Sequence, residues 1–212
     1  MNNSRISKNT QSSSLPTKGE STRAAILDAA LFLAGRDGLE GLTIGLLAER
    51  MQMSKSGVFA HFGSREDLQV EVVREYHRRF ESTVFLPALN EPRGLPRFEK
   101  MLSLWIKLRI DEVSTGCIYI SGAVEFDDRA GAIRDQLVLS VQTWRKALER
   151  ALKEAIQEGH LRKSCDCDSF LFQIYSFILG LHHDARFLKL ANSVELAKSS
   201  IANLIQANLN IH

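Results

Sequence analysis

The segment 43–68 constrains the fold most, because it reads as two short helices joined by a tight turn and followed at once by a third. Its first apolar residues recur at the spacing of one helical face: Ile44, Leu47, Ala48 and Met51. Gln52 and Met53 form the predicted turn, and Ser54 offers a side-chain oxygen that can cap the next helix. Short helices of this kind must bury their apolar backs against further elements.

The second short helix has two different faces. Val58 and Phe62 lie four residues apart and point to the same core, while Lys55, Ser56 and Gly57 stay in solvent at the start of the helix. A short helix with a buried back and a small, basic, hydrogen-bonding front can enter the major groove of DNA.

This region resembles the helix-turn-helix of TetR-type bacterial transcriptional regulators. The similarity is densest in Met-Ser-Lys-Ser-Gly-Val-Phe-Ala-His-Phe at 53–62 and closes with Ser-Arg-Glu-Asp-Leu at 64–68. It also covers the stretches 22–34, 38–39 and 42–44, together with Ala48. Two positions depart from the family pattern. Phe59 stands where a tyrosine is usual, which removes a phenol that could reach a phosphate, and Gln52 stands where a glycine is common.

Helical periodicity continues to the end of the chain, and no segment reads as a convincing strand. With the resemblance, this predicts an all-α fold of about nine helices: a three-helix DNA-binding head followed by a helical ligand-binding and dimerisation bundle. We expect a disordered arm at 1–19, a head at 20–66 with its helix-turn-helix at 43–62, and the effector and dimerisation domain at 67–212.

Breaks along the chain define the expected helices of the bundle. A long helix should start at Ser64 and stop before Pro87, where a proline- and glycine-rich stretch begins. Asp127 or Asp128 is expected to cap a later helix that ends at Gly159, a residue suited to a left-handed cap.

The last two helices, at about 166–189 and 193–210, are expected to pair with those of a second copy. The segment 170–181 is apolar almost all round, so every side of it needs a cover. A second stripe lies nearby, composed of Ala197, Ile201, Leu204 and Ile205. The resemblance implies a homodimer held by these helices, and the alternative is a helix at the centre of a monomeric core. Two heads related by a twofold axis would grip half-sites about 34–36 Å apart.

The predicted DNA contacts divide into reading and positioning. Lys55, Ser56 and Gly57 lie where base edges can be reached. The side chains placed for phosphates are Thr43, Ser54, His61 and Arg65. Phe59 is expected to touch a thymine methyl group or to lie along the DNA backbone, and His61 has the alternative of a packed or capping role.

A second site is expected in the bundle, because the resembled family binds a small molecule there. Large apolar side chains that could line such a pocket are Phe85, Met101, Trp105, Tyr119, Phe126 and Trp144. The same residue types also build ordinary cores, so packing is the alternative for each of them.

Composition supports a cytoplasmic protein with no membrane span and no cofactor. The longest apolar stretch is about half of what a bilayer requires, and three cysteines leave one unpaired under any disulfide scheme. The net charge is +2, and the excess lies within the first 80 residues, although so small an imbalance can be accidental. Cys165 and Cys167 with nearby histidines imitate a metal-ligand set, but their spacing is too narrow for a structural zinc site, so no metal is expected.

The sequence thus predicts a homodimeric regulator, most simply a repressor, that binds a pseudopalindromic double-stranded DNA operator and leaves it when a small apolar effector binds. No common catalytic motif is present, so we do not expect an enzyme. The alternatives are a DNA-binding protein without an effector and a helical enzyme or carrier whose first third only resembles a DNA-binding head.

Overall fold

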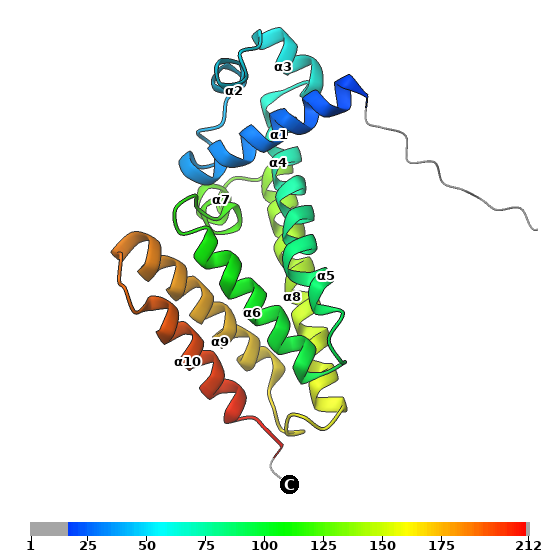
Figure 1. Ribbon diagram of the computed structural model, residues 1–212, viewed down its shortest axis with the longest axis vertical. Helices are drawn as coiled ribbons and strands as arrows, with labels where there is room; N and C mark the ends of the chain where they lie inside the picture. Colours follow the sequence, from blue (N-terminus) through cyan, green and yellow to red (C-terminus); the bar gives the residue numbers. More distant parts are fainter. Residues whose placement is uncertain (1–16, 211–212) are drawn as a thin grey trace, which may run out of the picture.

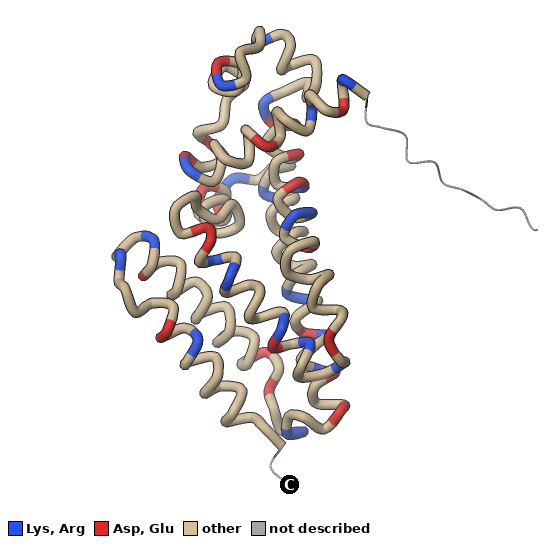
Figure 2. The backbone as a smooth tube through the Cα atoms, viewed as in Figure 1, with Lys and Arg blue, Asp and Glu red and all other residues tan. Residues whose placement is uncertain are grey.

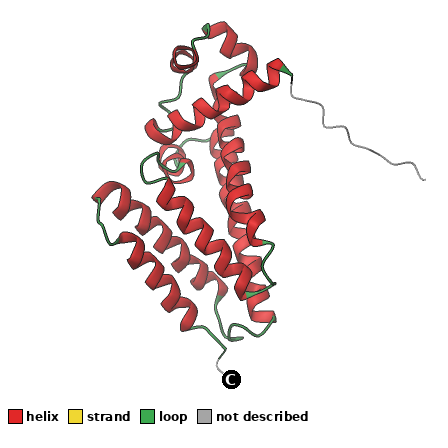
Figure 3. Ribbon diagram, viewed as in Figure 1, coloured by secondary structure: helices red, strands yellow, loops and turns green. Residues whose placement is uncertain are grey.

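The computed structural model describes residues 17–210, which form a small head at one end of an elongated helical bundle (Figure 1). The head consists of α1 (Lys18–Asp37), α2 (Ile44–Met51) and α3 (Lys55–Phe62). The described residues contain helices and loops but no strand, apart from one isolated bridge near the carboxyl end (Figure 3). The predicted all-α fold is therefore confirmed. The expected arm at 1–19 falls outside the described residues except for its last three, and Lys18 already begins α1.

The bundle starts with a continuous rod that runs through α4 (Arg65–Phe80), the π-helix η1 (Glu81–Phe85) and the short α5 (Leu86–Ala88). Its other elements are α6 (Leu95–Asp111), α7 (Ile118–Phe126), α8 (Ala132–Gln157), α9 (Cys167–His182) with the π-helix η2 (His183–Leu188), and α10 (Ser193–Gln206). With α4–α5 and α9–η2 each counted as one rod, the described residues form nine helical rods, as the sequence predicts.

Side-chain caps fix the starts of the helices in the head. The Thr43 hydroxyl accepts a hydrogen bond from Leu46 N at 3.1 Å, and the Ser54 hydroxyl accepts one from Gly57 N at 3.0 Å. The Ser64 hydroxyl caps α4 in the same way. Each cap satisfies a backbone N–H that the first turn of a helix leaves without a partner. The predicted starts of α2, α3 and α4 are therefore confirmed.

The long helices α4 and α8 pack together and form the spine of the molecule (Figure 1). The apolar stripe of α4, from Leu68 through Val72 and Tyr76 to Phe80, is buried along its whole length. The apolar stripe of α8, which runs from Ile133 to Ala155, is also buried, except that Val141 is half-buried. Burial of such stripes supplies most of the stability of an amphipathic helix.

Three predicted boundaries are wrong. The rod that begins with α4 continues past Pro87, because the chain widens into η1 and Pro87 falls in the first turn of α5, where its missing N–H is tolerated. Asp127 and Asp128 do not cap α8, which starts after Gly131. The last helix ends at Gln206, because the following residues turn back and Asn208 O accepts a hydrogen bond from Arg162 N.

The predicted outer stripe of α10 is also corrected. Ala197, Ile201 and Ile205 are buried inside the protomer, where α10 packs on α9, and Leu204 is half-buried. These residues therefore belong to the core of the protomer and leave other residues on its outer surface.

Candidate nucleic-acid interface and effector cavity

The turn between α2 and α3 is tight and has a left-handed residue at its centre. Gln52 has φ 53° and ψ 40°, the conformation for which a glycine is the least strained residue. Met53 N still donates to Ala48 O at 2.9 Å, so the turn is closed by a backbone hydrogen bond. The departure from the family pattern at Gln52 thus leaves the geometry of the turn intact.

The helix α3 is anchored by its back and presents its front to solvent. Val58 is fully buried and Phe62 nearly so, whereas Lys55 and Ser56 are exposed. Phe59 is 53% exposed, although large aromatic side chains are usually buried. Lys55, Ser56 and Phe59 therefore lie on the exposed front of α3.

Two glycines leave room around this face. A Cβ added to Gly45 in α2 would lie 3.3 Å from Cε of Lys55, so the lysine stem runs close over the α2 backbone. A Cβ added to Gly57 would lie 3.2 Å from the Ser54 hydroxyl, which caps the same helix. Because Gly57 has no side chain, nothing projects from the front of α3 at this position, and a duplex could approach the helix backbone there.

The side chains predicted for phosphate contacts differ in their exposure and in their hydrogen-bond partners. The hydroxyls of Thr43 and Ser54 are exposed caps that accept from backbone N–H groups, and that of Thr43 still has its own hydrogen to donate. Ser54 Oγ also lies 3.1 Å from Ser56 Oγ, and either of these two hydroxyls can be the donor. His61 is half-buried, with its ring centre 6.4 Å from that of Phe62. Arg65 donates to Leu42 O at 3.0 Å and to Glu40 O, so its guanidinium mainly holds the loop before α2.

Charge alone does not mark the head. Lys and Arg are interleaved with Asp and Glu in the head and along α4, α6 and α8, while α9 and α10 carry few charges (Figure 2). Two cations of the head already have partners: the guanidinium of Arg50 lies 4.5 Å from the ring centre of Phe32, and Arg23 pairs with Glu71 of α4 at 2.5 Å. The shape and exposure of α3 therefore mark the candidate interface more clearly than the net charge does.

The predicted ligand-binding residues divide among three cavities of the bundle. Trp105, Tyr119 and Trp144 line one cavity of about 340 Å³ between α6, α7, α8 and α9, which we call the tryptophan cavity. Phe126 instead lines a neighbouring cavity of about 330 Å³, which shares Tyr119. Phe85 and Met101 line a third, of about 410 Å³, between the rod of α4–α5, α6 and α8. The single pocket expected from the sequence is therefore not formed by all six residues.

Aromatic rings form much of the wall of the tryptophan cavity. The ring centres of Trp105 and Trp144 are 5.4 Å apart and nearly perpendicular, and that of Tyr175 lies 5.0 Å from Trp105. Edge-to-face pairs of this kind hold their rings in fixed orientations. The guanidinium of Arg145 lies 4.4 Å from the ring centre of Tyr175.

A buried polar cluster borders the same cavity, and sequence reasoning missed it. Arg109 is 2% exposed, and its Nη2 lies 2.6 Å from a carboxylate oxygen of Glu112. The Tyr76 hydroxyl donates to Glu112 at 2.8 Å and accepts from Arg109 at 3.0 Å, while Nη1 of Arg109 donates to the sulfur of Cys117. Burial raises the pKa of Glu112, and the charge of Arg109 opposes that shift.

One signal in the sequence could have revealed this cluster. Arg109 follows Trp105 by four residues, so it continues the apolar stripe of α6 with a charge. A charged residue on a buried helical face needs a partner in the interior. Glu112 lies one turn further along and provides it.

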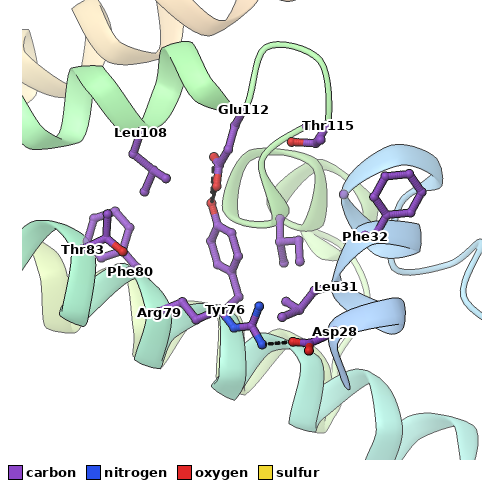
Figure 4. Close-up of a pocket in the computed structure, with 13 residues that line it drawn as sticks. Asp28, Leu31, Phe32, Tyr76, Arg79, Phe80, Thr83, Leu108, Glu112 and Thr115 are labelled. Atoms are coloured by element: carbon purple, nitrogen blue, oxygen red, sulfur yellow. Dashed lines mark hydrogen bonds and ion pairs between the residues drawn. The ribbon is translucent and has the colours of Figure 1, made fainter. Parts of the chain in front are cut away.

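A further cavity of about 360 Å³ lies where the head meets the bundle (Figure 4). It is bounded by α1, α4 and the loop between α6 and α7. Figure 4 shows the Tyr76 side chain reaching Glu112 across it, and Arg79 of α4 paired with Asp28 of α1. This cavity contains none of the predicted ligand-binding residues.

The helix α7 and the loop before it connect the tryptophan cavity to the head. Backbone meets backbone at Gly35 of α1, where an added Cβ would lie 2.8 Å from Thr115 O. At the other end of α7, the Glu125 carboxylate accepts a hydrogen bond from Glu40 N at 2.8 Å. Tyr119 and Ala123, between these ends, line the tryptophan cavity. A change in the cavity therefore has a short route to the head.

Within 17–210 no group of three or more potential metal ligands comes together, and Cys117, Cys165 and Cys167 are free. None of the described helices has both the length and the apolar character required to cross a membrane.

Comparisons with known proteins agree on one family. A model described as "Tetracyclin repressor-like, C-terminal domain" matches residues 94–201, and one described as "Bacterial regulatory proteins, tetR family" matches 26–72. The HTH-type transcriptional regulator TtgR of Pseudomonas putida is 24% identical over 183 residues, which cover 84% of this chain and 86% of that relative.

Solved structures show the same fold. A TetR-family regulator from Cytophaga hutchinsonii has a TM-score of 0.81 at 19% identity and covers 94% of this chain and 100% of its own. A putative transcriptional regulator from Saccharomonospora viridis, solved in complex with choline, has a TM-score of 0.77 at 20% identity, with coverages of 91% and 99%.

Proposed function

Because this chain belongs to the TetR family of DNA-binding transcriptional regulators, which are not enzymes, we propose that it is a homodimeric repressor released from its operator by a small effector. The observation that carries the proposal is α3, a helix with a buried back and an exposed front of Lys55, Ser56 and Phe59. Such a helix can lie in the major groove, where Lys55 can donate to guanine and Phe59 can contact a thymine methyl group.

A second copy is proposed to pack against α9 and α10, which lie side by side along one flank of the molecule (Figure 1). Large apolar side chains are exposed on this flank and in the turn between the two helices: Phe172, Leu179, Phe187, Leu188, Leu190 and Leu196. Several large exposed apolar side chains on one flank are typical of an interface between subunits. It differs from the predicted stripe, which the protomer itself buries.

Release of the operator is proposed to depend on α7. A ligand in the tryptophan cavity touches the middle of α7, and the ends of α7 contact the head through Gly116 and Glu125. An effector lowers operator affinity if it binds more tightly to a conformation in which the two heads do not match the spacing of the half-sites. The size of the decrease is set by the difference between the effector's affinities for the two conformations.

The proposal can be tested with an operator selected from a random DNA pool. We expect Lys55→Ala to weaken binding to it by roughly 1–3 kcal/mol and to relax the preference at one base pair of each half-site. Lys163→Ala is the matched control, because Lys163 is an exposed lysine in the loop between α8 and α9, at the far end of the bundle (Figure 1). Failure to enrich any palindrome, or equal affinities for both variants, would contradict the proposal.

A regulator without an effector is the second candidate function. A screen of small molecules by thermal shift separates the two, since a ligand that binds the native state raises the melting temperature.

A further inference from the structure

The cavity between the rod of α4–α5, α6 and α8 has an excess of positive charge in its wall. Its volume is about 410 Å³, and we call it the basic cavity. The charged side chains that line it are three cations and one carboxylate: Arg97, Lys146, Arg150 and Glu154. The wall therefore carries a net positive charge.

Two of these cations have no acidic partner. Arg97 lies 3.6 Å from Glu154, and the same carboxylate lies 3.5 Å from Arg93, so its charge is already offset. Lys146 and Arg150 are both exposed, and within residues 17–210 no carboxylate oxygen lies within 4 Å of either. Their charges are therefore free to meet an anion from outside the chain.

The arrangement of the two free cations favours such an anion. Lys146 and Arg150 stand four residues apart on one face of α8, a spacing at which like charges destabilise a helix. Glu149 lies in the groove beside them but is paired with Lys153 at 2.5 Å. An anion between Lys146 and Arg150 would offset their repulsion, and a guanidinium can hold a carboxylate through two parallel hydrogen bonds.

The position of these cations separates them from the candidate DNA interface. The helix α8 starts beside the head, where Gly131 lies close to Glu66, and runs away from it (Figure 1). Lys146 and Arg150 belong to the half of α8 that is remote from the head, so they are not placed to contact DNA held by α3.

The rest of the wall is largely apolar, and part of it faces solvent. Leu89, which follows α5, is 41% exposed, and Phe85 is half-buried, whereas Met101 of α6 is 1% exposed. Phe85 is the last residue of the π-helix η1. Turns of π-helix are rare, and they occur frequently at functional sites. An apolar molecule in the cavity would remove the exposed parts of Phe85 and Leu89 from water, which favours binding.

We propose that the basic cavity binds a small amphipathic carboxylate. Its carboxylate group lies between Lys146 and Arg150, and its apolar body packs on Phe85, Leu89 and Met101. The volume of about 410 Å³ falls within the range of small-molecule pockets. The site is separate from the tryptophan cavity, and binding there does not depend on the proposed release of the operator.

The test compares 2-naphthoate with 2-naphthamide, which has nearly the same shape but no charge. Among the described residues Met101 is the one methionine outside the head, so its methyl resonance in protein labelled with ¹³C at the methionine methyl groups reports on this cavity. Met101→Leu assigns that resonance. We expect both compounds to shift it through the ring current of the naphthalene.

The dissociation constant of 2-naphthoate should be roughly five- to tenfold lower than that of 2-naphthamide, because two partly exposed ion pairs form with the carboxylate alone. A higher salt concentration should narrow this difference, since it screens exposed charges.

Charge-removing variants separate the two ion pairs from the overall charge of the protein. Lys146→Gln and Arg150→Gln should each lower the preference for 2-naphthoate roughly two- to fourfold and leave the affinity for 2-naphthamide unchanged. Lys163→Gln is the matched control, because it removes the same charge at an exposed position in the loop between α8 and α9 and should leave the preference unchanged. Melting temperatures establish that each variant is folded.

Equal affinities for the two compounds would overturn the inference, and so would a Met101 methyl resonance that neither compound moves. Tighter binding of 2-naphthylmethylamine, which carries a positive charge on the same ring system, would overturn it as well. A preference that Lys163→Gln lowers as much as Lys146→Gln would show an effect of net charge alone. Displacement of 2-naphthoate by an equal concentration of acetate would refute the role of the apolar wall. These measurements need no DNA, so their outcome is distinct from that of the operator experiments.

Discussion

Substitution of Gly116 by alanine tests whether the joint between head and bundle depends on direct backbone contact. Gly116 is buried in the loop before α7 and has φ +89°, and a Cβ there would overlap the carbonyl oxygen of Gly35 in α1. The atom in the way belongs to a helix backbone, which cannot rotate aside as a side chain can. Relief therefore requires α1 and the loop to separate.

The expected cost has two parts. A left-handed conformation costs alanine about 1 kcal/mol relative to glycine, and overpacking a buried contact costs about 1–3 kcal/mol. Gly159→Ala isolates the first part, because Gly159 has φ +75° and an added Cβ would meet nothing within 4 Å. We therefore expect a loss of about 2–4 kcal/mol for Gly116→Ala and about 1 kcal/mol for the control.

Urea-induced unfolding at fixed protein concentration measures both losses. In thermal unfolding, the difference of about 1–3 kcal/mol should appear as a gap of roughly 2–12 °C in melting temperature. Operator affinity should fall for Gly116→Ala alone, because the head loses its fixed position while α3 is untouched. Equal destabilisation by the two substitutions would refute the idea that this contact holds the head to the bundle.

Two further predictions concern the flank of α9 and the pH dependence of stability. Phe172 is 69% exposed on α9, so Phe172→Glu should shift the protein from dimer to monomer in sedimentation velocity. Ser164 is also exposed but lies in the loop between α8 and α9, so Ser164→Glu is the control and should leave the dimer intact. Burial, followed by the nearby charge of Arg109, lowers the pKa of His182 from 6.5 to about 4. The unfolded chain then takes up the proton first as the pH falls, so this contribution to stability is complete above pH 6.5 and is lost between 6.5 and 4. His182→Gln should flatten the unfolding free energy in that pH window, and an unchanged slope would exclude His182 as its source.

The two cavities near the head differ in what they can transmit. The cavity of Figure 4 lies directly under α1, and its wall contains the ion pair of Arg79 and Asp28. The tryptophan cavity lies further from the head but reaches it through α7. Because α7 is short and contacts the head at both ends, a small rotation of it changes two contacts at once. This arrangement gives a physical basis for the coupling that we propose between ligand and operator.

Local patterns predicted the helices and the exposed front of α3 well. The stripes from Leu68 to Phe80 in α4 and from Ile133 to Ala155 in α8 are buried as their spacing requires. Thr43 and Ser54 cap the helices that follow them, since a cap is decided by a few neighbouring residues. Boundaries failed at Pro87, where a π-helix absorbed the proline, because packing of α4–α5 against α6 and α8 outweighed a local preference.

The sequence by itself determined which residues turn inward along each helix, because burial follows the period of a helix and the caps are local. Only the tertiary structure decided which inward residues meet. Trp105 and Trp144 came together while Phe85 and Met101 joined another cavity, and Arg109 found Glu112, Tyr76 and Cys117. Such meetings depend on how helices cross, and crossing is set by the packing of side chains distant in the chain, which no local spacing encodes.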